Sequence, residues 1–174
     1  MNKWVFLNNE FIEEEQAALH VSDLAIQRGY GIFDFFKVVD NIPLFLDDHL
    51  ERFYYSVQKM RLTINQQPGE LKDIIYTLIK KNNIPHAGIR ITVTGGYSLD
   101  GYQLTNPNLI ISQQPVQIAS IQAQKGIKLI TYEYQRDLPD VKTINYAMAI
   151  WLQPFIKERG ADDVFYFKGW FTNW

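Results

Sequence analysis

Apolar residues are grouped in short runs at the start of the chain. Residues 4–7 and 11–13 form two such runs on either side of Asn8 and Asn9, a pattern that favours a β-hairpin. A turn-rich stretch then leads into the β-rich run 33–39 (FDFFKVV), which ends at Asp40-Asn41 and is followed by IPLFL. This second pair of runs predicts another hairpin.

From Asp47 the apolar residues recur at helical spacing, and Asp47 or Asp48 is predicted to cap the helix. A second helix is predicted after Pro68. Its apolar face consists of Leu71, Ile74, Ile75, Leu78 and Ile79. Two further strands are expected at residues 89–94 and 108–112.

The second half of the chain predicts a strand around 127–134, a helix from Thr143 to about Arg159, and a strand at 163–167. The polar segment 113–126, punctuated by proline and glycine, is the best candidate for a linker. The pattern indicates an α+β fold. We expect a small N-terminal mixed α/β domain at 1–115, a linker at 116–125, and the beginning of a second α/β domain at 126–174.

Composition narrows the class of protein. The chain has 174 residues, enough for roughly one to one and a half domains of about 150 residues. Its 47% hydrophobic content is typical of a globular protein, and its net charge of −2 gives no sign of a nucleic-acid partner. Cysteine is absent, which excludes disulfides and thiol nucleophiles. No signal peptide or membrane span is predicted, so we expect a soluble, cytoplasmic protein.

The residues that could carry chemistry are few. His20, His49 and His86 are far apart in the sequence, so no metal site is predicted. Lys142 follows a Pro-Asp turn and precedes Thr143, a plausible helix cap. The field at a helix N-terminus would favour the neutral amine that a nucleophilic lysine needs. The alternative is an ordinary solvated lysine in a loop.

Two polar features accompany the first predicted helix. His49, Arg52 and Ser56 fall within roughly 60° of one another around its axis. They could offer a guanidinium and a hydroxyl to a phosphate, or they could simply be the polar flank of an amphipathic helix. Asp34 shares a strand face with Phe36 and Val38. Either this carboxylate is buried with a partner, or the face is half exposed.

Four segments occur in an order that resembles a known family. They are DLAIQRGYGIFDFF, HLERFYYS, IRITVTGG and RDLPDVKTINYAMA. Together they are similar to the motifs of the fold-type IV pyridoxal-phosphate enzymes, which include branched-chain aminotransferases, D-amino acid aminotransferases and aminodeoxychorismate lyases. The likeness covers essentially the whole chain.

The resemblance implies roles for individual residues. Lys142 would hold pyridoxal 5'-phosphate through a Schiff base, and Arg52 would bind its phosphate. Phe33 would pack near the cofactor. Asn145 and Tyr146 would support the helix of the lysine, and the pocket for substrate would include Tyr30, Phe33, Gly95, Arg136 and Tyr146.

The chain also departs from the family pattern. Tyr30 replaces an Asp between two glycines, and Asp34 stands where Glu is usual. Gly95 occupies a position where many members have an Arg, which in the D-amino acid branch holds the substrate carboxylate. Asn173 falls where a Glu normally pairs with the pyridine nitrogen, and a neutral amide keeps that nitrogen protonated poorly. Members normally continue well past the position of Trp174, so we expect a C-terminally truncated chain.

The function that the resemblance implies is transfer of an amino group between an amino acid and a 2-oxo acid, in a homodimer. Elimination of pyruvate, as in aminodeoxychorismate lyases, is an alternative that uses the same lysine. A truncated, non-catalytic relative is another.

Overall fold

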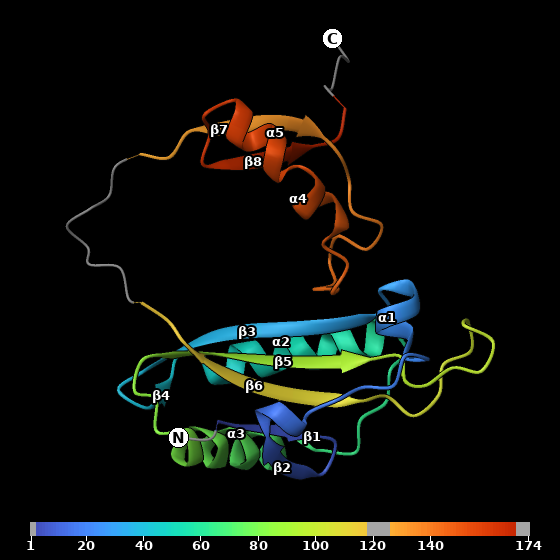
Figure 1. The fold of residues 1–174 in the computed structure, drawn as a ribbon, viewed down its shortest axis with the longest axis vertical. Coiled ribbons are helices and arrows are strands. Elements are labelled where there is room, and N and C mark those ends of the chain that lie inside the picture. The colour runs from blue at the N-terminus through green and yellow to red at the C-terminus, as the bar shows by residue number, and fades with distance from the viewer. Residues whose placement is uncertain (1–2, 118–125, 170–174) are drawn as a thin grey trace. The chain divides into compact units, whose positions relative to one another are not determined.

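The computed structural model describes residues 3–117 and 126–169 (Figure 1). Contacts divide the chain into two compact units. The first comprises Met1–Ile118 together with Val141–Asn145, and the second comprises Ala119–Asp140 and Tyr146–Trp174. The predicted boundaries at 115 and 126 stay predictions, and most of the expected linker, residues 118–125, lies outside the described residues.

The first unit is built on a six-stranded sheet with the order β2-β1-β6-β5-β3-β4, in which all neighbours are antiparallel. The strands are β1 (Trp4–Leu7), β2 (Glu10–Glu13), β3 (Gly31–Val39), β4 (Ile42–Pro43), β5 (Ala87–Thr94) and β6 (Leu109–Pro115). Both predicted hairpins are confirmed. Asn8, Asp40 and Asn41 adopt the positive φ angles that tight hairpin turns require.

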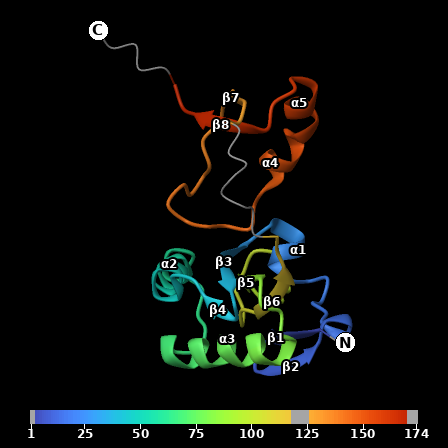
Figure 2. The same ribbon diagram turned by 90° about the vertical axis from the view of Figure 1, so that its left-hand side faces the viewer.

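The helices of this unit are α1 (Leu24–Arg28), α2 (Leu46–Lys59) and α3 (Pro68–Asn82), with a short 3₁₀ turn η1 at Glu14–Gln16. Figure 2 shows α2 and α3 beside the sheet. Their apolar faces share one hydrophobic core with the inward-facing residues of β3, β5 and β6. In α2 these residues include Leu50 and Phe53, and in α3 they include Leu71 and Ile75. The two predicted amphipathic helices are thereby confirmed.

The predicted cap of α2 is wrong. The N-cap residue is Phe45, with φ 51° and no side-chain cap, while Asp47 and Asp48 lie in the first turn of the helix. Strand β4 at Ile42–Pro43 lies only two residues before the start of α2 at Leu46, so the helix begins before the aspartates. The two carboxylates still favour the helix, because negative charge is stabilising near its N-terminus.

The second unit contains the parallel strands β7 (Leu129–Glu133) and β8 (Asp163–Phe167), with α4 (Ala147–Trp151) and α5 (Gln153–Glu158) between them in the chain. Both predicted strands are confirmed. The expected continuous helix from Thr143 is wrong in two respects: it begins only at Ala147, and it is interrupted at Leu152. Pro154 explains the interruption, since its nitrogen has no hydrogen to donate to the carbonyl of Ile150.

Tyr54 of α2 is a partly buried ionisable group in the first unit. Its hydroxyl donates a hydrogen bond to the carbonyl of Gln66 at 2.8 Å, and its ring meets that of Phe53 edge-on. Burial, and secondarily the negative charge of Glu70, raise the pKa of Tyr54 to about 12. The folded state therefore prefers the protonated phenol.

This shift predicts a specific alkaline weakness. The stabilisation from Tyr54 is complete below the ordinary pKa of about 10 and is lost as the pH rises towards about 12. Urea unfolding measured across this range should show the free energy of unfolding falling more steeply in the wild type than in Tyr54→Phe. Equal slopes in the two proteins would contradict the prediction.

Candidate active site

The segment Val141–Asn145 belongs to the first unit because it pairs with strand β3. One edge of β3 is occupied by β5 along its length, and β4 pairs only with Val38 and Val39 on the other edge. The remaining part of that second edge is taken by the segment. Phe33 N donates to the carbonyl of Lys142 at 2.9 Å, and Ile144 N donates to the carbonyl of Gly31 at 3.1 Å. The backbone of Lys142 is thus fixed to strand β3.

Gly31 has no side chain at a point where both β5 and the segment approach β3 closely. A Cβ at this position would lie 2.6 Å from the carbonyl oxygen of Val93 and 3.0 Å from Cδ1 of Ile144. The first distance is shorter than real Cβ contacts allow, and it involves backbone, which cannot move aside cheaply. The neighbouring Val141 is buried in the core of the first unit. The burial of Val141 holds the segment, and the absence of a Cβ on Gly31 leaves room for Ile144 beside β3.

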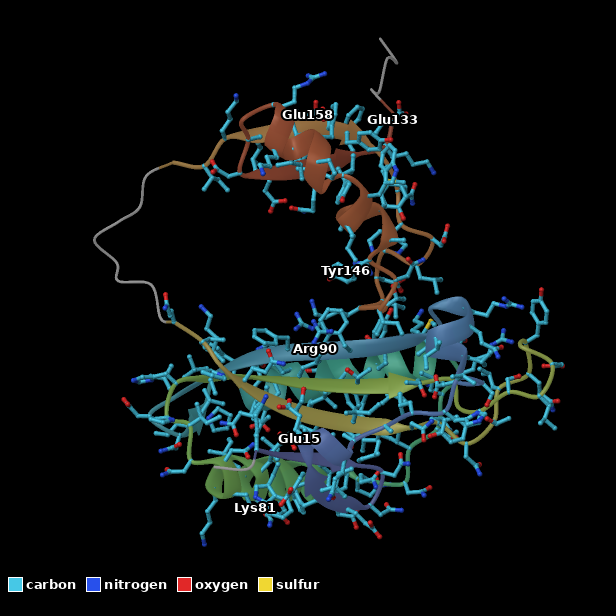
Figure 3. The ribbon with its side chains drawn as sticks, viewed as in Figure 1. Glu15, Lys81, Arg90, Glu133, Tyr146 and Glu158 are labelled. Carbon is cyan, nitrogen blue, oxygen red and sulfur yellow. The ribbon has the colours of Figure 1, made fainter. Side chains whose placement is uncertain are left out.

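The side chain of Lys142 lies over Phe33. Its Nζ is 4.7 Å from the ring centroid, and Cζ of Arg90 on β5 is 4.1 Å from the same centroid. Figure 3 labels Arg90 on the sheet. Two basic groups therefore lie over the ring of Phe33. Each is favourable next to the ring, and together they attract anions. Phe33 and Lys142 thus lie against each other, but the helix-field argument for Lys142 is wrong, because α4 begins five residues later.

Sequence reasoning missed Arg90. In the run IRITVT, Ile89 and Ile91 are buried in the core, so Arg90 must face the other side of the sheet. That alternation is visible in the sequence. The pairing of Arg90 with Phe33 is not, because it depends on which strand lies next to β5.

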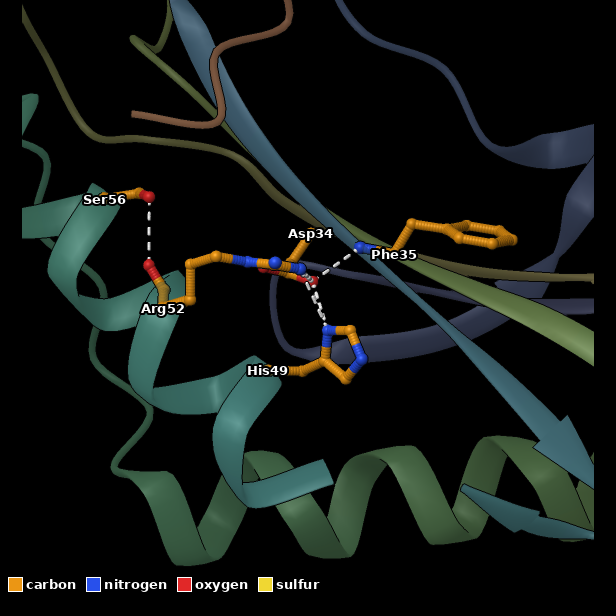
Figure 4. A network of polar contacts seen from close by, with 5 residues as sticks. All are labelled: Asp34, Phe35, His49, Arg52 and Ser56. Carbon is orange, nitrogen blue, oxygen red and sulfur yellow. Dashed lines mark hydrogen bonds and ion pairs between the residues drawn. The ribbon is translucent and has the colours of Figure 1, made fainter. Parts of the chain in front are cut away.

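Asp34, the next residue of β3, anchors Arg52 on the face towards α2 (Figure 4). Arg52 donates from Nε to Oδ2 at 2.8 Å and from Nη2 to Oδ1 at 2.9 Å. The side chain of Asp34 is 1% exposed, whereas that of Arg52 is 49% exposed. The hydrogen bond to Asp34 raises the pKa of Arg52, with desolvation acting in the opposite direction. Of the two alternatives left open for Asp34, the structure shows the buried carboxylate with a partner.

His49 and Ser56 complete this network. His49 Nδ1 lies 2.8 Å from Asp34 Oδ1, and the imidazole packs against the ring of Phe36. Ser56 is buried, and its hydroxyl donates to the backbone carbonyl of Arg52 at 2.9 Å. His49, Arg52 and Ser56 of α2 therefore do lie close together. The Ser56 hydroxyl, however, is directed to the backbone and not to a ligand.

Tyr30 and Gly95 lie next to each other at another part of the first unit. The hydroxyl of Tyr30 donates to the carbonyl of Met60 at 2.7 Å, and burial raises its pKa, with Arg61 acting in the opposite direction. A Cβ on Gly95 would lie 2.8 Å from Cδ1 of Leu24 and 3.1 Å from Cδ1 of Tyr30. An arginine could occupy this position only if both neighbours shifted.

The remaining predicted residues fall in the second unit, at the end of the segment paired with β3, or outside the described residues. Arg136 Cζ lies 5.6 Å from the ring of Tyr146, the residue that precedes α4. Asn173 lies outside the described residues. Asn145 ends the segment that pairs with β3. The roles of all the predicted site residues stay predictions.

Other features of the described residues lie away from these clusters. A cavity of about 490 Å³, bordered by amide side chains such as Asn8, Gln66 and Asn106, includes none of the predicted site residues. His20 contacts Ser22, and His86 lies 3.7 Å from Asp40. Within residues 3–117 and 126–169, no group of three or more acidic or histidine side chains could hold a metal ion.

Across the same described ranges, every helix falls short of the length and apolar character needed to cross a membrane.

The family model described as "Amino-transferase class IV" matches residues 31–169, which include β3, Arg52, Arg90 and Lys142. The chain belongs to this family. The predicted family is thus confirmed, as is the mixed α/β fold class.

Relatives of this class IV aminotransferase chain include two curated enzymes. D-alanine aminotransferase of Staphylococcus epidermidis is 29% identical over 150 residues, which cover 81% of this chain and 52% of the relative. Aminodeoxychorismate lyase of Bacillus subtilis is 23% identical over 141 residues, which cover 78% of this chain and 47% of the relative. The chain therefore spans about half the length of these relatives.

A solved structure shows the same fold. The T.th. branched-chain amino acid aminotransferase, complexed with N-(5'-phosphopyridoxyl)-L-glutamate, aligns with a TM-score of 0.82 at 20% identity. The alignment covers 97% of this chain and 59% of the neighbour. At this identity, the likeness establishes the architecture.

The contact of Gly31 yields a test of the site's framework. Gly31→Ala should lower the free energy of unfolding by about 1–3 kcal/mol, because the added methyl group has no room beside Val93. It should also increase hydrogen exchange at the Phe33 and Ile144 amides, measured by NMR. Gly69→Ala is the matched control, since its Cβ would meet nothing within 4 Å. If both variants exchange like the wild type, Gly31 is not what holds the segment.

Proposed function

We propose that this chain supplies the lysine and the phosphate-binding arginine of a pyridoxal 5'-phosphate-dependent aminotransferase, which moves an amino group between an amino acid and a 2-oxo acid. The observation that carries the proposal is the use of consecutive residues of β3. Phe33 holds the backbone and side chain of Lys142, and Asp34 holds the guanidinium of Arg52. A reactive amine and a half-exposed cation are therefore positioned from one rigid strand.

The residues present fit the cofactor at two of its groups. The primary amine of Lys142 is the group that can bond to an aldehyde, and Arg52 offers a charged donor to a phosphate. The solved branched-chain neighbour contains a phosphopyridoxyl compound, which supports the same chemistry for this chain. Asn173, the residue expected near the pyridine nitrogen, is not among the described residues.

The residues of the chain have separate roles in the proposed reaction. When bound, pyridoxal phosphate withdraws electrons from the substrate carbon that bears the amine. Lys142 takes the proton from that carbon at Nζ and returns it elsewhere on the reacting molecule, as a general base and then a general acid. Phe33 packs against the reacting groups. Arg90, 4.1 Å from the Phe33 centroid, attracts the substrate carboxylate.

A second candidate reaction is elimination of pyruvate, as the name of the Bacillus subtilis relative suggests. It uses the same lysine. Gly95 stands where the D-amino acid branch has an arginine for the substrate carboxylate, and its neighbours crowd that position. A non-catalytic relative is the remaining alternative. Amino-group transfer is proposed first, because the Staphylococcus epidermidis relative and the structural neighbour are both aminotransferases by name.

The test of the function is chemical trapping. The protein is incubated with pyridoxal phosphate, reduced with borohydride and digested, and the peptides are mapped by mass spectrometry. We expect a pyridoxyl group on Lys142 and none in Lys142→Ala. Lys80→Ala, which removes an exposed lysine of α3, is the matched control and should retain the adduct. An adduct that survives Lys142→Ala unchanged would disprove the assignment.

The two reactions are separated by their products. Transfer produces a new amino acid from an added 2-oxo acid, whereas elimination releases pyruvate from aminodeoxychorismate without a second substrate. A trapped Lys142 adduct with neither product would favour the non-catalytic alternative.

We also propose that the chain forms a homodimer in the cytoplasm. Large apolar side chains are exposed around α1 and the loop after β5, and self-association would cover them. They are Val21, Ile26, Leu99 and Tyr102.

Analytical ultracentrifugation tests the dimer. Leu99→Asp, which places a charge on this surface, should shift the protein towards the monomer, while Tyr76→Asp on the exposed face of α3 should not. A monomeric wild-type protein would refute the proposal.

A further inference from the structure

We infer that Asp34 is a positioning residue for anion binding: it holds one edge of the Arg52 guanidinium so that the other edge faces a phosphate group. The inference rests on the proposed function, in which Arg52 binds the cofactor phosphate. It concerns how that arginine is prepared rather than whether the cofactor reacts.

The geometry of the ion pair divides the guanidinium into two edges. Nε and Nη2 donate to the two oxygens of Asp34. Among the residues that the structure describes, none accepts a hydrogen bond from Nη1, and nearly half of the Arg52 side chain is exposed. An arginine carries five N–H donors in a rigid, planar fork, so fixing one edge fixes the direction of the other.

Asp34 is itself held rigidly. Its Oδ1 accepts from Phe35 N at 2.7 Å, in addition to its contacts with His49 and Arg52. Since an ionised carboxylate only accepts hydrogen bonds, His49 Nδ1 must carry the hydrogen in this contact. The nearby 3.0 Å approach of Nη2 to Nδ1 is then a contact between two donors that share one oxygen. The carboxylate therefore has no freedom to follow a moving arginine.

Rotamer freedom explains why this arrangement matters for phosphate binding. A free arginine side chain loses much rotamer freedom when it binds a ligand, whereas one already fixed by Asp34 has lost it on folding. The entropy cost of ordering the Arg52 side chain is therefore incurred on folding, before phosphate binds.

The charge of Asp34, taken alone, predicts the opposite effect on phosphate affinity. The direction of the change in affinity when Asp34 is replaced therefore tests the inference. Asp34 carries a negative charge that repels phosphate, so removing it should tighten phosphate binding if charge dominates. If positioning dominates, the same change weakens binding because Arg52 is released.

The test compares Asp34→Asn with Asp48→Asn, which removes an equal charge from an exposed position on α2. Inorganic phosphate is titrated into each protein and followed by calorimetry, while NMR follows the Nε–H signal of Arg52. In Asp34→Asn, we expect the dissociation constant to rise about tenfold and the Nε–H signal to lose its protection from exchange. In Asp48→Asn, both should stay close to the wild type. Unchanged or tighter binding in Asp34→Asn overturns the inference.

Arg52→Lys provides a second route if Asp34→Asn folds poorly. Lysine keeps the charge but cannot form the two-point contact with Asp34. The affinity should fall, and adding Asp34→Asn to Arg52→Lys should lower it little further, because both changes remove the same interaction. Fully additive losses would show that Asp34 acts independently of the fork, and would overturn the inference.

The outcomes also separate this inference from the proposed function. Wild-type protein that binds no phosphate, or phosphate binding that is unaffected by Arg52→Ala, overturns the positioning role whatever Lys142 does. Phosphate binding that depends on Asp34, combined with no pyridoxyl adduct on Lys142, would refute the function and leave the positioning role standing.

Discussion

The pairing of residues 142–144 with the free edge of β3 is the interaction on which the candidate site depends. It brings Lys142, from the C-terminal part of the chain, next to strand β3, which lies near the N-terminus in sequence. Two backbone hydrogen bonds and the burial of Val141 fix a peptide segment that has no helix or hairpin of its own there. A loop lysine held in this way has a defined position, which the proton-transfer role proposed for Lys142 requires.

The end of β5 depends on a different constraint, a buried polar network around Asp23. This carboxylate is fully buried and accepts hydrogen bonds from Ala25 N, Thr94 Oγ1 and Asn108 Nδ2 at 2.7–2.8 Å. It thus caps α1 and joins that helix to β5 and β6. Because α1 is held close to the strand, Leu24 presses on Gly95, and a longer side chain has no room there. The packing of a helix thereby limits which residue can stand at a position expected to face the substrate.

Local features of the sequence were sufficient for elements whose structure is locally determined. Asn8 and Asp40-Asn41 take up the left-handed conformations of tight turns, and Pro68 starts α3 as its fixed φ allows. Prediction failed where distant parts of the chain compete for the same residues. Thr143 has the residue type of a helix cap, but it forms a β-bridge with Ile32 instead. Periodicity of one segment cannot reveal such a partner.

The candidate site divides in the same way. The family motifs identified Lys142, Arg52 and Phe33, because their spacing along the chain is distinctive. The partner of Asp34 and the contact between Arg90 and Phe33 required the packing of α2 and the neighbour of β3 to be known. These are contacts between elements, so no single segment contains the information.

Strand β3 therefore determines both halves of the site through its alternation. Successive residues of a strand face opposite sides, so Phe33 can face Lys142 and Arg90 while Asp34 faces α2. A slip of one residue in the pairing with β5 would exchange these faces and place the carboxylate among the cations and the ring against the core. The ion pair of the buried Asp34 with Arg52 opposes that slip, since a slipped register would break this pair and move Phe36 out of the core, and both changes would be costly. The register that stabilises the sheet is thus the same register that positions the lysine and the arginine.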